Sequence, residues 1–311
     1  MFEFLQNALA IFGDSVRVLF RYPKFAIPLF IVWLFIAPIV LYFRFFFNNT
    51  GQSFTTLLLL AFGVIYLFSL LFTFSCVVLL ELIQQHETGR GFSLPCAISE
   101  TIRKDLSGIL IISLIWAIVW FILALLKALT SRKRGGHRQG ASPAEAARVL
   151  SGSGGVFSWF GLGISMIQKL VRMTVFLILP AVAWEDKGAF SAIGRGLHVL
   201  REHAGEFLAS YAGTELAGLV VFLPAIIAVM AVKHAPDIFW YLVIIYTSVA
   251  WTFSMYLEQM TVALLFLWHK KWEVAAQEAE KSGKPVPALE DVPRPSLLDD
   301  VNDLAVTAAE R

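Results

Sequence analysis

The sequence predicts an all-α polytopic membrane protein with six transmembrane helices. Of its 311 residues, 58% are hydrophobic and 15% are charged, whereas a soluble domain is about half apolar and about a quarter charged. The apolar residues gather in long stretches that are almost free of charge, and such stretches need lipid or a large core to cover them. The net charge of +2 gives no overall field for nucleic acid. We therefore expect lipid, and no nucleic acid, around this chain.

Six stretches are long and apolar enough to cross a bilayer, which takes about 20 residues. They cover residues 25–47, 54–80, 106–129, 156–184, 207–232 and 238–268. The fourth stretch contains Gln168, Lys169 and Arg172, and two interpretations of it stay open. Either it is one long tilted helix, or residues 156–163 lie at the membrane surface and a shorter helix spans. Both cross once, so residues 1–272 are predicted to form one six-helix transmembrane domain.

Each odd-numbered span follows a segment with the spacing of an amphipathic helix. The apolar face of the first segment consists of Phe4, Ala8, Ile11, Ser15 and Leu19. Residues 98–106 and 193–204 repeat this spacing before the third and fifth spans. Helices of this kind bury their apolar side at the headgroup boundary. The pattern indicates three interfacial amphipathic helices in a threefold repeat, in which each unit is an interfacial helix followed by a hairpin of two spans.

Charge placement predicts the orientation of the chain. An even number of spans puts both termini on one side, and that side carries more of the flanking Lys and Arg, which predicts cytoplasmic termini. Residues 131–155 are rich in Gly, Ser and Arg, and we expect a flexible basic loop there. Residues 273–311 carry several prolines and an acidic end, which is typical of a polar, largely disordered tail. A solvated tail and a docking peptide for a protein partner are both open.

The most specific local pattern lies between the fourth and fifth spans. Pro180 comes at the end of a span, Glu185 follows it, Gly188 offers a turn, and Arg195 lies on the next short helix. Pro180 and Gly188 explain a chain reversal without any further function. We expect Glu185 to brace the following helix by pairing with Arg195 or Lys187.

This pattern is similar to that of an uncharacterised six-span prokaryotic family, a domain of unknown function, that resembles the membrane domain of glycerophosphodiester phosphodiesterases. The resemblance covers most of residues 1–270 and implies architecture and a place in a prokaryotic cytoplasmic (inner) membrane. The phosphodiesterases carry a separate soluble catalytic domain, to which nothing in this sequence corresponds. The sequence also departs from the family pattern at Gly196, where the family usually has serine.

Four ionisable residues are predicted inside the spans, where a charge is costly and therefore a candidate for function. Lys169 and Arg172 lie on the fourth span, Glu215 on the fifth and Glu258 on the sixth. At about 1.5 Å rise per residue they share a layer roughly 10 Å thick. One interpretation is a structural network that locks three helices together, or cations that extend outward to headgroups. The other is a polar site that binds an anionic lipid headgroup, a proton or a small solute.

Patterns typical of catalysis or of a cofactor are not evident in the sequence. His198 and His203 share a short predicted helix but are five residues apart, a poor spacing for joint coordination, so we expect no metal and no cofactor. The sequence thus favours a non-enzymatic protein that handles anionic membrane lipids or scaffolds a complex. The alternative is a transporter or channel that uses the charged layer. An intramembrane enzyme would need a reactive group inside a cavity.

Overall fold

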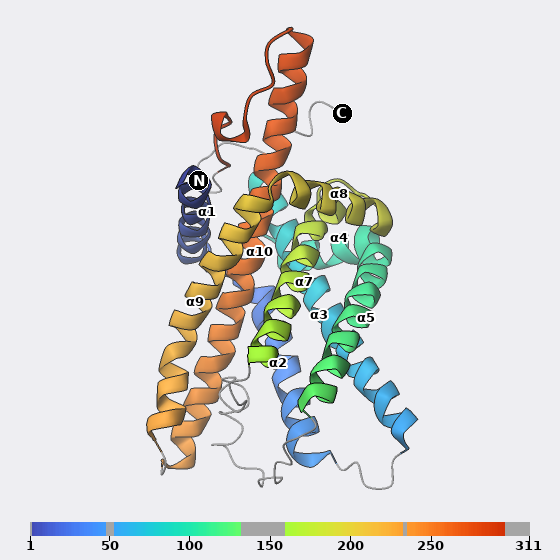
Figure 1. Ribbon diagram of the computed structural model, residues 1–311, viewed down its shortest axis with the longest axis vertical. Coiled ribbons are helices and arrows are strands. Elements are labelled where there is room, and N and C mark those ends of the chain that lie inside the picture. Colours follow the sequence, from blue (N-terminus) through green and yellow to red (C-terminus); the bar gives the residue numbers. More distant parts are fainter. Residues whose placement is uncertain (1, 48–52, 132–158, 233–234, 296–311) are drawn as a thin grey trace.

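The computed structural model describes residues 2–47, 53–131, 159–232 and 235–295, and these residues form a helical bundle without strands (Figure 1). Six of the described helices are long and apolar enough to cross a membrane. The prediction of an all-α polytopic fold is therefore confirmed, and the chain is a multi-pass membrane protein.

The described elements follow one another in this order: α1 (Phe2–Arg21), η1 (Pro23–Ala26), α2 (Ile27–Leu41), η2 (Tyr42–Phe46), α3 (Phe54–Glu87), α4 (Leu94–Glu100), η3 (Thr101–Asp105), α5 (Leu106–Ser131), α7 (Trp159–Ala183), α8 (Ala189–Glu202), α9 (Ala204–Ala231), α10 (Asp237–Lys281) and η4 (Leu289–Asp291). The six candidate spans centre on α2, α3, α5, α7, α9 and α10. Within the described part of the fourth stretch, α7 is one continuous helix, as the first of the two interpretations expects. Residues 156–158 lie outside the described residues.

Short polar signals set the helix ends. The side chain of Ser53 accepts a hydrogen bond from the backbone N–H of Thr56 at 3.1 Å and caps α3. Between α7 and α8 the left-handed residue is Asp186, with φ of 49°, while Gly188 is extended at φ of −62° and precedes α8. The reversal predicted at Gly188 therefore depends on Asp186, because Asp tolerates the left-handed conformation through local hydrogen bonding.

The three central helices α3, α7 and α10 carry most of the fully buried apolar side chains, among them Leu79, Phe176 and Phe266. α8 crosses the end of the bundle above α7, and α1 and α4 lie toward the same end, from which α10 projects (Figure 1). α1 packs against α9 and α10, and Ser15 lies 3.3 Å from Thr261. Helices α1, α4 and α8 thus gather at one end of the bundle. Their contact with lipid headgroups stays a prediction.

The segment after α10 departs from the predicted tail. α10 continues to Lys281, and the chain then turns at Gly283 and runs back along the helix. The indole of Trp268 donates a hydrogen bond to the carbonyl of Val292 at 3.0 Å, and Trp272 donates to Pro287 at 2.9 Å. These contacts hold residues 287–292 of the predicted tail against α10, because two indoles anchor this proline-rich segment. Residues 132–155 of the predicted basic loop and residues 296–311 lie outside the described residues.

Candidate functional site

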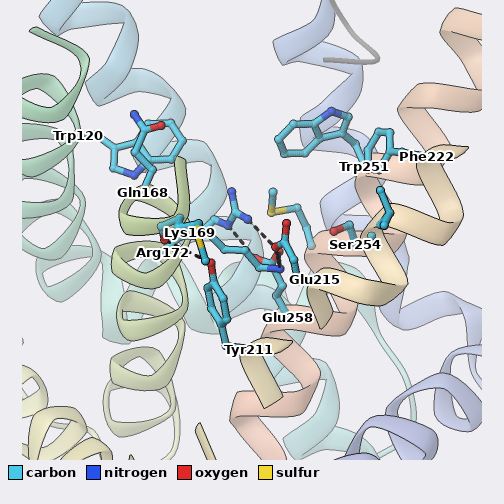
Figure 2. A pocket seen from close by; sticks show the side chains of 14 residues that line it. Trp120, Gln168, Lys169, Arg172, Tyr211, Glu215, Phe222, Trp251, Ser254 and Glu258 are labelled. Atoms are coloured by element: carbon cyan, nitrogen blue, oxygen red, sulfur yellow. Dashed lines mark hydrogen bonds and ion pairs between the residues drawn. The ribbon is translucent and has the colours of Figure 1, made fainter. Parts of the chain in front are cut away.

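The four ionisable residues predicted inside the spans come together in one network (Figure 2). Arg172 donates to both carboxylate oxygens of Glu258, with Nε to Oε2 at 2.7 Å and an amino nitrogen to Oε1 at 2.8 Å. Lys169 pairs with Glu215 and also lies 3.6 Å from Glu258. Helix α7 supplies both cations from one face, since they are three residues apart, and α9 and α10 supply one carboxylate each. The network joins three helices and carries no net formal charge.

Burial differs sharply within this network. The side chain of Glu258 is 1% exposed and that of Arg172 is 12% exposed, whereas that of Glu215 is 60% exposed. A forked arginine–carboxylate pair in a low-dielectric site is rigid and strong. The Arg172–Glu258 pair is therefore the fixed part of the network. The side chain of Lys169 is only 10% exposed, so Glu215 is the part of the network that another molecule can reach.

A cavity of about 600 Å³ opens beside the network (Figure 2). Its remaining lining is mainly aromatic and apolar, and the side chains that contribute to it include Trp120, Tyr211, Leu219, Phe222 and Trp251. The ammonium of Lys169 lies 5.0 Å from the centre of the Tyr211 ring, within cation–π range. The cavity thus has a charged wall and an aromatic wall.

A second cavity of about 200 Å³ adjoins the first and is lined almost entirely by apolar side chains. Four residues line both cavities: Trp120, Arg172, Trp251 and Met255. In the second cavity Trp33 stacks on Trp251, with ring centres 5.2 Å apart. The two cavities therefore lie next to each other around these four side chains, and charged groups line one while apolar side chains line the other.

The second group of predicted residues lies at the end of the bundle, outside this space. Pro180 is within the last turn of α7, and the Glu185 carboxylate lies 2.7 Å from the Lys187 ammonium and 3.4 Å from the Arg195 guanidinium. Both partners that the sequence suggests for Glu185 are thus in contact with it. Arg195 also forms a forked pair with Glu273 of α10. This contact ties α8 to the last helix and does not reach the charged network.

Sequence reasoning missed a histidine cluster next to this brace. His269 of α10 is fully buried, and its Nδ1 lies 2.8 Å from Nε2 of His203, at the junction of α8 and α9. Burial, together with the nearby His269 and His198, lowers the pKa of His203 to about 4, so that its imidazole is neutral at pH 7. The available signal was the run from His269 to Glu273, since residues four apart share a helix face. Only the fold shows which histidines that face meets.

No family model matches the chain, and a comparison with curated proteins finds no match. The resemblance to the membrane domain of glycerophosphodiester phosphodiesterases therefore stays a prediction. The function has to be argued from the site alone.

Proposed function

We propose that this chain is a non-enzymatic membrane protein that binds a phospholipid in the space beside the charged network. The observation that carries the proposal is that a charged cavity and an apolar cavity lie side by side and share Trp120, Arg172, Trp251 and Met255. Such a pair of cavities suits an amphiphile. The larger cavity, of about 600 Å³, falls within the usual range of about 300–1,000 Å³ for ligand sites.

The contacts available to a lipid follow from the burial of each charge. A phosphate group approaches Lys169 and Arg172, which both line the larger cavity. It competes with the exposed Glu215 for the Lys169 ammonium, while the buried Arg172–Glu258 pair stays intact. Part of an acyl chain then occupies the apolar cavity, beside the stacked rings of Trp33 and Trp251. Anionic phospholipids fit best, because their headgroup carries no ammonium group. An ammonium group would pair with Glu215 rather than with Lys169 and Arg172.

The placement of this protein completes the proposal. The distribution of Lys and Arg supports termini in the cytoplasm, and the resemblance over most of residues 1–270 supports a prokaryotic inner membrane and the same six-span family. A scaffold that binds a protein partner through its C-terminal tail is compatible with lipid binding. The segment at residues 285–292 packs along α10 and holds the start of the tail in one position, where such a partner binds.

Narrowing the cavity tests the proposal. Leu219 lines the larger cavity and is 58% exposed, and we expect Leu219→Trp to fill part of the headgroup space. Overpacking a protein interior costs about 1–3 kcal/mol, and a similar loss of binding energy lowers phospholipid retention by about 5- to 150-fold. Native mass spectrometry of protein extracted from vesicles of phosphatidylglycerol and phosphatidylethanolamine measures the retained mass and identifies the headgroup.

Leu216→Trp is the matched control, because Leu216 lies on the same helix, is 64% exposed and does not line the cavity. Wild type and this control should carry one phospholipid with a preference for phosphatidylglycerol. Equal retention in the Leu216 and Leu219 variants, or bare protein in all three samples, would refute the proposal.

A second candidate function is transport of a proton or a small solute through the same space. Its support is the exposed Glu215 carboxylate, which pairs with the buried Lys169 and so links the cavity to a buried charge. In this case Glu215→Gln abolishes flux into liposomes while leaving the thermal stability unchanged. Flux through the variant equal to that of wild type rules out transport by this carboxylate, and loss of flux with unchanged thermal stability supports it.

A further inference from the structure

A cluster of imidazoles and carboxylates lies at the bundle end, apart from the charged network. Its members come from the end of α8, from the α8–α9 junction and from α10: His198, Glu202, His203, His269 and Glu273. Two sets of three among them, which share His269, bring their ligand atoms within 4.8 Å of one another. His203 is 7% exposed and His269 is fully buried. Imidazole and carboxylate together suit zinc and related divalent transition metals.

The surroundings of the two ring nitrogens of His269 differ in charge. On the Nε2 side, the Arg195 guanidinium lies 3.3 Å from the ring nitrogen and also holds Glu273 in a forked pair. A metal ion at Nε2 would lie next to the positive Arg195 guanidinium. The nearby Glu273 carboxylate would attract it little, because Arg195 already neutralises this carboxylate. On the Nδ1 side, the neighbours are His203 at 2.8 Å and the Glu202 carboxylate at 3.6 Å. The Nδ1 side therefore is the one that favours a cation.

The spacing on the Nδ1 side fits tetrahedral coordination. Ligand atoms about 2.0–2.1 Å from a zinc ion are about 3.3 Å from each other in a tetrahedron. The separations of 2.8 Å and 3.6 Å to His269 bracket this value, so small side-chain movements are sufficient. Nε2 of His198 lies 3.3 Å from the other oxygen of Glu202 and so orients this carboxylate, as outer partners of metal ligands do.

We propose that Glu202, His203 and His269 bind one divalent transition metal ion, such as Zn²⁺, which links the α8–α9 junction to α10. The fourth position faces His198 and solvent, because the side chains of His198 and Glu202 are 53% and 32% exposed. Such an ion fixes the end of α8 against the long last helix, outside the lipid cavity. The proposed site differs from the expectation of no metal. That expectation considered the spacing of His198 and His203 along the chain, which carries no information about His269.

Metal titration of the whole purified protein, prepared with an affinity tag that lacks histidine, tests this proposal. Co²⁺ reports tetrahedral coordination through its visible absorption, and Zn²⁺ competition gives the affinity. Wild type should bind one equivalent, and Glu202→Gln and His203→Gln should each weaken binding by more than about tenfold. Glu202 is a partly exposed surface residue, so Glu202→Gln decides the outcome if His203→Gln does not fold.

Two further variants test whether the bound ion lies at this site. One removes a histidine elsewhere in the protein, and the other removes a carboxylate on the Nε2 side of His269. His86→Gln is the control, because His86 packs against Tyr22 and Phe25, apart from the cluster. It should bind metal as wild type does, and Glu273→Gln should retain the ion as well. The proposal is overturned if wild type binds no metal, if Glu202→Gln binds as tightly as wild type, or if Glu273→Gln alone loses the ion.

Discussion

Arg172→Met is expected to destabilise the protein by about 3–5 kcal/mol, the typical result of removing one partner of a buried ion pair. The change leaves the Glu258 carboxylate 1% exposed, with Lys169 at 3.6 Å. Glu258→Met should cost a similar amount, because the Arg172 guanidinium then loses both hydrogen bonds to this carboxylate. Thermal unfolding in a mild detergent measures both effects.

The double variant Arg172→Met, Glu258→Met separates stability from function. Replacing both charges with apolar side chains of similar size is often neutral or stabilising, so the double variant should be more stable than either single variant. It should nevertheless retain less phospholipid, because a phosphate loses one of its two cations. A double variant whose destabilisation equals the sum of the two single effects would show that the pair has no coupling energy.

Gly196→Ala is expected to destabilise the protein by about 1–3 kcal/mol through overpacking between α8 and α7. A Cβ atom at this position would lie 2.6 Å from Cγ1 and 2.9 Å from Cα of Ile178. The backbone atom cannot move aside as a flexible side chain does, so α8 has to shift. Serine, the residue usual at this position in the family that the sequence resembles, would meet the same obstruction.

Gly194→Ala is the matched control on the same helix, since a Cβ atom there meets nothing within 4 Å. Alanine favours a helix over glycine by about 1 kcal/mol, so this variant should be as stable as wild type or more stable. The melting temperatures of the two variants in detergent give the comparison. Equal melting temperatures for Gly194→Ala and Gly196→Ala would contradict the close packing of α8 on α7.

The amino-acid sequence by itself determined the fold class and the membership of the charged network. Stretches of about 20 apolar residues have few alternatives to a transmembrane helix, because every backbone polar group must be satisfied in lipid. Lys169, Arg172, Glu215 and Glu258 stand out for the same reason, since each interrupts an apolar stretch. Helical rise alone placed them at similar depths, which favoured a shared network but left open that the cations extend outward to headgroups.

Only the tertiary structure decided the partner of each charge and the shape of the space around them. Depth along a helix does not give rotation about its axis, so the sequence left both a brace and a binding site open. The packing of α10 against α7 and α9 buried Glu258, while Glu215 on α9 stayed exposed. The same limit applies to His269, which lies on α10. It contacts His203, which is 66 residues away in the sequence, and Glu202 next to it. Side chains from distant segments converge through packing, and packing has no short-range signature in the sequence.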